Sequence, residues 1–100
     1  MNKVFISQPM NGKTEKEIRE ERDKAFALIS KTLEGCELID SLIQEDLDEN
    51  HPGLKYLSKS IEMLDDAVGA WFLEGWQDAR GCRIEHACCI AYGIPVYYLY

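Results

Sequence analysis

The chain has 100 residues, of which 46% are hydrophobic and 29% are charged, and its formal net charge is −7. This length and composition predict one globular domain over residues 1–100 and exclude a disordered chain. The acidic excess argues against a nucleic acid polymer as partner, because the surface would repel its phosphates. A small anionic ligand in a local pocket remains compatible with this charge.

The N-terminal segment 1–7 lacks the apolar run of a signal peptide, and no run approaches the roughly 18 residues that span a bilayer. We therefore expect no membrane partner. The four cysteines (Cys36, Cys82, Cys88 and Cys89) lack the spacing of a disulfide framework. Reduced thiols and a cytoplasmic location are expected.

The first third of the chain predicts a strand followed by a long helix. Lys3–Ser7 is apolar, with β-branched and aromatic residues, and is typical of a buried strand. Turn residues follow over 8–12. Thr14 and Glu17 have capping-box spacing, and apolar residues then recur at helical intervals as far as 35.

The middle of the chain predicts a strand, a helix and another strand. Cys36–Asp40 reads as a short strand, and the acidic stretch 41–53 as an exposed loop with at most one helical turn. Apolar residues at helical spacing predict a helix over 54–64. Ala67–Leu73 lacks polar alternation, which indicates a central strand buried on both faces. A loop is expected over 74–78.

A helix over Ala79–Tyr92, stopped by Gly93, and a last apolar strand over Ile94–Tyr100 complete the pattern. Strands and helices thus alternate along the chain, which implies right-handed crossovers between parallel strands. The predicted fold class is α/β, a small doubly wound, Rossmann-like or flavodoxin-like parallel sheet of about four strands with helices on both faces.

In such sheets ligands bind at the carboxyl ends of the strands, where the strand order reverses. Segments 7–12 and 74–85 and the loop after Asp40 should converge there. Glu85 lies about one turn into the last helix, whose N-terminus favours its ionised form. Gly81 lets a ligand approach the backbone, and the same helix end suits a phosphate. The alternative is that Glu85 is an exposed surface carboxylate.

Two segments, Ser7–Gly12 and Gly75–Glu85, resemble a small nucleoside 2-deoxyribosyltransferase-like family that is common in phages and bacteria. The resemblance extends nearly end to end in element order. In the wider superfamily, which includes deoxynucleoside-monophosphate N-glycosidases, a Gly-x-x-x-Glu segment opens this helix, and its glutamate attacks the anomeric carbon of the deoxyribose. Gly81 and Glu85 occupy those positions, so the resemblance implies that Glu85 is the nucleophile.

The sequence departs from that pattern at two places. The better-known enzymes have an aspartate roughly at Ser58 and a tyrosine roughly at Val4, and neither matches. A second acid should protonate the departing base. The candidates are Asp40, Asp65, Asp66 and Asp78, and no motif selects one of them.

Further candidates surround Glu85 in the expected crevice. Arg80 and Arg83 either bind a 5′-phosphate or pair with surface acids. Ser7 and Asn11 either contact the sugar or phosphate or simply form the turn. Trp76 either stacks on a base or anchors its loop. The predicted substrate-binding residues are Ser7, Gln8, Met10, Asn11, Gly12, Trp76, Arg80 and Gly81.

No motif indicates a cofactor or a metal. Gly-x-Gly-x-x-Gly and Walker loops are missing from the sequence. Segment 46–57 begins like a calcium loop but lacks its glycine and final glutamate. Cys82, His86 and Cys89 lack a second ligand pair at zinc spacing, and we expect a buried thiol cluster instead.

These observations leave three functional hypotheses. The first is a nucleoside or nucleotide N-glycosyl enzyme, hydrolase or transferase, and the second is a non-catalytic nucleotide-binding module of the same fold. A protein-interaction domain is the third, suggested by the apolar segment 94–100. We use that segment to predict a homo-oligomer, a dimer or higher, because superfamily relatives complete their sites with residues of a neighbouring subunit.

Overall fold

The computed structural model describes residues 2–41 and 53–100, so most of the predicted 41–53 loop and the calcium-like segment lie outside it. The strands are β1 (Lys3–Ser7), β2 (Glu37–Leu38), β3 (Gly69–Leu73) and β4 (Val96–Leu99). The helices are α1 (Glu15–Thr32), α2 (Leu54–Leu64) and α3 (Arg80–Tyr92), with a short 3-10 turn, η1 (Trp76–Asp78). In these residues, no helix is long and apolar enough to cross a membrane.

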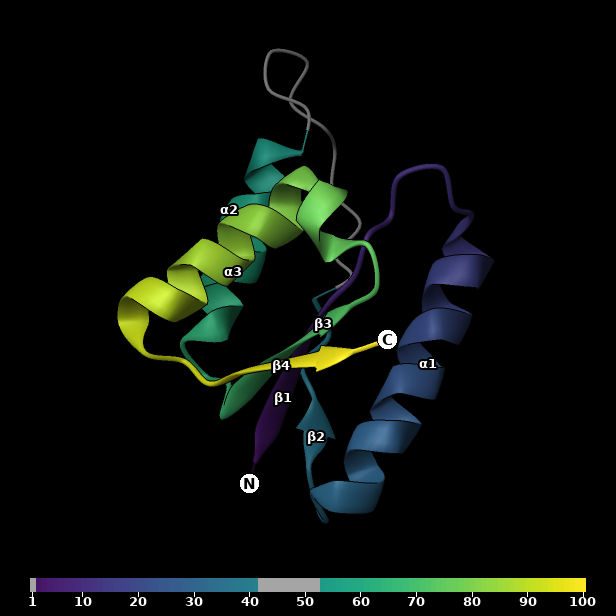
Figure 1. The fold of residues 1–100 in the computed structure, drawn as a ribbon, viewed down its shortest axis with the longest axis vertical. Coiled ribbons are helices and arrows are strands. Elements are labelled where there is room, and N and C mark those ends of the chain that lie inside the picture. Colours follow the sequence, from purple (N-terminus) through teal and green to yellow (C-terminus); the bar gives the residue numbers. More distant parts are fainter. Residues whose placement is uncertain (1, 42–52) are drawn as a thin grey trace.

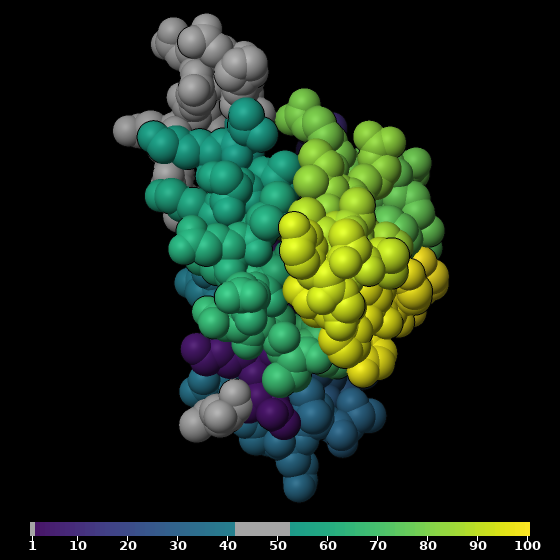
Figure 2. Space-filling model, turned by 90° about the vertical axis from the view of Figure 1, so that its left-hand side faces the viewer, coloured from purple at the N-terminus to yellow at the C-terminus, as the bar shows by residue number. Residues whose placement is uncertain are grey.

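All strand pairs are parallel, and the strand order is β2-β1-β3-β4. Helix α1 covers one face of the sheet, and α2 and α3 cover the other (Figure 1). From the side of these two helices, Figure 2 shows α2 and α3 next to each other over the sheet. The predicted doubly wound α/β fold is confirmed.

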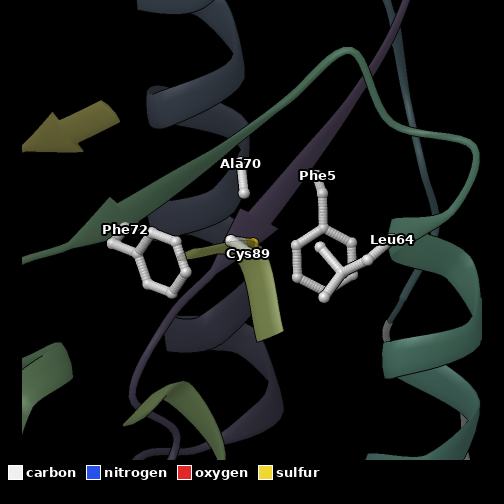
Figure 3. Close-up of a cluster of buried hydrophobic side chains, with 5 residues drawn as sticks. All are labelled: Phe5, Leu64, Ala70, Phe72 and Cys89. Atoms are coloured by element: carbon white, nitrogen blue, oxygen red, sulfur yellow. The ribbon is translucent and has the colours of Figure 1, made fainter. Parts of the chain in front are cut away.

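Alternation along β1 divides the core into two layers. Val4 and Ile6 pack against Ala25 and Ile29 of α1. Phe5 points to the other face, where it belongs to the cluster drawn in Figure 3. That cluster consists of Phe5, Leu64, Ala70, Phe72 and Cys89.

The predicted start of α1 is confirmed in detail. Thr14 Oγ1 accepts a hydrogen bond from the backbone N–H of Glu17 at 3.1 Å, and the Glu17 carboxylate accepts one from the backbone N–H of Thr14 at 3.1 Å. This reciprocal capping satisfies two donors that a helix end leaves free. The helix therefore begins where local sequence alone places it.

Three strands are shorter than predicted. The predicted strand 94–100 spans only Val96–Leu99, and the N–H of Ile94 still donates to Cys89 O of α3 at 2.9 Å. The predicted strand 36–40 pairs only over Glu37–Leu38, and the N–H of Ser41 donates to Ile39 O at 3.0 Å instead of extending the ladder. Before β3, the N–H of Ala67 donates to Leu64 O at 3.1 Å, so this residue still belongs to the turn after α2. The predicted 74–78 loop contains η1.

The strand order predicts where a ligand crevice would lie. From β1 the chain passes through α1 to β2, which pairs with the side of β1 away from β3. From β3 it passes through α3 to β4, which pairs with the side of β3 away from β1. The connections therefore diverge above the adjacent carboxyl ends of β1 and β3. This is the point at which doubly wound sheets bind ligands.

We expect Gly69→Ala to lower the free energy of unfolding by about 1–3 kcal/mol, the usual cost of overpacking. A Cβ there would lie 2.9 Å from Tyr97 Cε2 and 3.1 Å from Trp71 Cζ3. These rings stack with 4.6 Å between their centroids, so the pair must separate to admit a methyl group. Urea denaturation measures the change.

Gly81→Ala is the matched control for this substitution. Its Cβ would meet Leu57 Cδ1 at 3.8 Å, an ordinary contact, and alanine favours a helix more than glycine does. Stability should stay the same or rise. Equal losses in the two variants would contradict the steric explanation.

Candidate functional site

Glu85 is buried, with 7% of its surface exposed. The buried residues of α3 are Cys82, Glu85 and Cys89, whose spacing places them on the side of the helix that faces the sheet. The carboxylate therefore points into the molecule at the reversal of strand order. The alternative of an exposed surface carboxylate is wrong.

Two serine hydroxyls hold the two oxygens of Glu85. Ser7, the last residue of β1, donates from Oγ to Oε1 at 2.7 Å. Ser60, buried in α2, lies with its Oγ 2.6 Å from Oε2. Both distances are typical of short, charge-assisted O–H···O bonds. Three elements, β1, α2 and α3, thus meet at one carboxyl group.

The Ser60 hydroxyl has a second acceptor, the backbone oxygen of Leu57 at 3.0 Å. One hydroxyl proton serves one of the two acceptors at a time. When Ser60 donates to Leu57, a protonated Glu85 can donate to Ser60 Oγ. The same geometry therefore accommodates both the neutral and the ionised carboxyl group.

Burial raises the pKa of Glu85 above its ordinary value of 4.5. Hydrogen bonds from Ser60 and Ser7 and the charge of Arg22 act in the opposite direction but are weaker. The helix N-terminus was expected to favour the ionised form, yet removal from water is the larger influence.

Arg22 and Tyr56 also belong to this site, and neither was predicted. Arg22 of α1 is 4% exposed, and its charge acts on both Tyr56 and Glu85. Burial raises the pKa of Tyr56 to about 12, so its hydroxyl is a neutral donor at physiological pH. Arg22 shares the buried stripe of α1 with Ala25 and Ile29, a signal that the sequence contained.

The predicted binding residues of the first loop differ in burial and in the groups that they contact. Gln8 is buried, but its amide donates to the backbone of α1 at 3.0 Å, so it anchors the loop. Met10 is half-buried, with Sδ 3.9 Å from the Tyr56 hydroxyl. Asn11 and Gly12 are exposed at the turn, where Gly12 has φ 79°. Of the predicted loop residues, the structure brings only Ser7 to Glu85.

Trp76 anchors its loop within an aromatic cluster. Its ring stacks on His86 with 4.1 Å between centroids, and its Nε1 donates to the Tyr100 hydroxyl at 3.1 Å. Tyr98 stacks on the same indole at 5.8 Å. Of the two roles considered for Trp76, the anchoring role is the one observed.

The start of α3 lies beside α2. Gly81 is half-buried near Leu57, whereas Arg80 and Arg83 are exposed. No side chain caps the first turn of α3, whose N-cap residue is Ala79.

The helix position that faces Glu85 is Ser60 rather than Ser58. Ser58 is exposed and donates to Lys55 O at 2.8 Å. Val4 packs under α1, on the face of the sheet opposite Glu85. The resemblance led us to expect an aspartate roughly at Ser58, whereas the α2 side chain that contacts Glu85 is Ser60, two residues further on.

The four candidate acids separate by position. Asp65 and Asp66 lie between α2 and β3, at the amino-terminal end of the strands, whereas the expected crevice is at their carboxyl-terminal end. Asp78 is exposed in η1. Asp40 follows β2 at the crevice edge, and its charge acts on Arg22 and Tyr56. Asp40 is therefore the best-placed second acid.

We expect Glu85→Gln to be more stable than wild type at pH 7, with the difference closing as the pH falls towards 4.5. A raised folded-state pKa means that the carboxyl group's stabilising contribution is complete below the unfolded pKa and is lost as pH rises through the folded pKa. The amide avoids this loss. Thermal unfolding from pH 4 to 8 measures it, at about 4–8 °C per kcal/mol.

Glu74→Gln, at an exposed position, is the matched control and should show no such difference. A Glu85→Gln protein that is less stable than wild type at every pH would refute the prediction. That result would mean that the ionised carboxylate contributes more to the fold than its desolvation costs.

Comparison with known proteins assigns the sequence to a family. A search of curated proteins and a search of solved structures found no match. A family described as Domain of unknown function (DUF4406) matches residues 2–98, which include β1, α2, α3 and every residue of the site. The chain therefore belongs to the DUF4406 family.

Proposed function

We propose that the chain is a nucleoside or nucleotide N-glycosyl enzyme, a hydrolase or a transferase, with Glu85 as its nucleophile. One observation carries the proposal: a buried carboxyl group at the reversal of strand order, fixed by Ser7 and Ser60. Buried ionisable groups with shifted pKa values concentrate at functional sites. The resemblance of segments 7–12 and 75–85 to the deoxyribosyltransferase-like family supplies the reaction class.

The reaction divides into two displacements. One Glu85 oxygen attacks the anomeric carbon, the bond from that carbon to the base nitrogen breaks, and the electron pair leaves with the base. An acid, for which Asp40 is our candidate, gives the base a proton. Water or a second base then attacks the anomeric carbon, releases the Glu85 carboxylate and returns a proton to the acid.

The serines position the nucleophile through both steps. While one Glu85 oxygen forms the ester, the other becomes its carbonyl oxygen and can keep its hydroxyl donor. Ser7 is fixed by β1 and Ser60 by α2, so neither depends on a loop for its placement. Rigid elements of this kind hold reacting groups within the narrow tolerance that catalysis requires.

The proposed substrate is a small nucleoside or nucleotide rather than a nucleic acid polymer, as the net charge of −7 favours. The expected crevice also lies at the ends of strands rather than on an extended basic surface. All four cysteines are free thiols, which fits the proposed cytoplasmic location.

A non-catalytic nucleotide-binding module is the second candidate. The observation that favours it is that the α2 residue facing Glu85 is a serine, Ser60, and that the aspartate expected roughly at Ser58 is absent from the sequence. Such a module would be stabilised against thermal unfolding by nucleotides but would release no base. Turnover therefore separates the two functions.

We expect purified protein to release free base from deoxynucleosides or their monophosphates, as measured by chromatography. Glu85→Gln should lower the rate by about 10⁴-fold or more, since it removes the nucleophile. Ser60→Ala should lower it by about 10–100-fold, the effect of one hydrogen bond to a charged group. Ser58→Ala, an exposed serine of the same helix, is the matched control.

Ser58→Ala should retain the wild-type rate. If no substrate of either class yields base, the N-glycosyl function is wrong. If base is released equally by wild type and Glu85→Gln, the assignment of the nucleophile is wrong.

We also propose that the chain forms a homodimer through α3. A groove of about 550 Å³ follows the outer face of this helix, and Glu85 is not part of its lining. The lining residues are Arg80, Arg83, Ile84, Ala87, Cys88, Ala91 and Tyr92. Ile84 and Tyr92 are 40% and 83% exposed, and the neighbouring edge strand β4 adds exposed tyrosines. A second copy would cover this apolar surface.

Light scattering should give twice the mass of the chain, and Ala91→Glu should give a monomer because it places a charge in the groove. Ile90→Glu is the control, since Ile90 is 64% exposed on the same helix but does not line the groove. A monomeric wild-type protein at micromolar concentration would exclude the dimer.

A further inference from the structure

Arg22 brings a charged group into the interior of the protein. It shares the buried side of α1 with Ala25 and Ile29 and is 4% exposed. Arginine is rarely buried to this degree without a partner for its charge. The groups around its guanidinium therefore indicate which kind of ligand would bind there.

A gap in the sheet explains why Arg22 lies there. Along the β1 edge, Asn2 O accepts the N–H of Glu37 and Val4 O accepts the N–H of Ile39. The next acceptor in this ladder is Ile6 O, but the chain has already turned away at Ser41. Nη2 of Arg22 donates to Ile6 O instead, at 3.2 Å. The guanidinium thus takes the place of the backbone N–H that a longer β2 would donate to Ile6 O.

Both hydrogen bonds of Arg22 go to neutral acceptors. Besides Ile6 O, its Nε donates to the amide oxygen of Gln8 at 2.9 Å. In residues 2–41 and 53–100, Nη1 is buried without a hydrogen-bond partner, and Arg22 makes no ion pair within 4 Å. The positive charge is therefore not neutralised by a direct contact with a described side chain.

The charge of Arg22 is within electrostatic reach of Glu85. The charged or ionisable groups that act on Arg22 come from three segments: Asp40 after β2, Tyr56 of α2 and Glu85 of α3, besides Arg19 on its own helix. Glu85 is occupied by Ser7 and Ser60 and does not bind Arg22 directly. A donor remains where an anionic group of a ligand would complete the site.

We propose that Nη1 of Arg22 binds an oxyanion, a phosphate or carboxylate group, of the ligand that occupies this crevice. The guanidinium is held rigidly by Gln8 and Ile6, so a bound oxyanion needs no rearrangement of the arginine. Burial strengthens the attraction, because little water competes for the charge. The Tyr56 hydroxyl, which donates to Met10 Sδ at 3.9 Å, is within electrostatic reach of Arg22 and stays neutral.

This assignment moves the anion site away from Arg80 and Arg83, which are exposed at the start of α3. For the N-glycosyl reaction it selects nucleoside monophosphates over free nucleosides. That selection rests on the proposed function, whereas the oxyanion site does not.

The test is titration of the whole chain with inorganic phosphate or acetate at constant ionic strength and pH 7, followed by thermal unfolding. We expect a saturable rise in Tm with at least one of these anions. Arg22→Gln should weaken binding by about 10–100-fold, the effect of losing a hydrogen bond to a charged group. Arg19→Gln, which removes an exposed arginine one turn away on α1, should bind as wild type does.

A second readout avoids any dependence on the folding of Arg22→Gln. In ¹H–¹⁵N spectra of the wild-type protein, the Nε–H signal of Arg22, assigned through its contact with Gln8, should shift saturably with the same anion. Phosphate and acetate midpoints identify the preferred oxyanion. If neither anion shifts this signal, the inference is overturned.

Failure of the inference is distinguishable from failure of the proposed function. Anion binding at Arg22 without base release from any substrate supports the oxyanion site and rejects the enzyme. Base release at equal kcat/KM from nucleosides and monophosphates, with no shift of the Arg22 signal, rejects the oxyanion site and supports the enzyme.

Discussion

The buried carboxyl group of Glu85 is the constraint on which the rest of the site depends. It is removed from water and bonded to Ser7 and Ser60, and burial raises its pKa more than these bonds lower it. A charge that is buried among neutral donors, without an oppositely charged partner, lowers the stability of the fold. Proteins retain such destabilising groups mainly at sites where function requires them. The fold therefore places an unfavourable group at the point where the strand order reverses.

Topology explains why these particular elements converge. With the order β2-β1-β3-β4, the connections after β1 and β3 diverge from the adjacent ends of these two strands. Ser7 ends β1, and α3 begins shortly after β3, so the hydroxyl and the carboxyl group approach from adjacent strands. Helix α2 returns across β1 and brings Ser60 above them. Arg22 reaches the same place from the opposite face, through the gap beyond β2.

The sequence predicted what local interactions determine. The capping box at Thr14, the three helices and the parallel sheet all follow from short-range pattern and alternation. The second strand was predicted too long because apolar content says nothing of where a chain leaves a ladder, and Ser41 leaves it early. Glu85 was found through its motif. Its strand partner Ser7 was predicted too, but the helix residues Ser60 and Arg22 were not, because polar helix residues are usually solvated.

The missed residues nevertheless carried a signal, since each interrupts an apolar stripe. Ser60 lies between Leu57 and Leu64 on the buried side of α2, and Arg22 precedes Ala25 and Ile29 on that of α1. A polar residue in such a position must find partners inside the protein. For Ser60 that partner is Glu85, whereas Arg22 keeps one nitrogen free within the described residues. Because these groups come from helices rather than loops, their positions do not depend on a ligand, and under the proposed function the nitrogen that the core leaves unpaired would contribute to specificity.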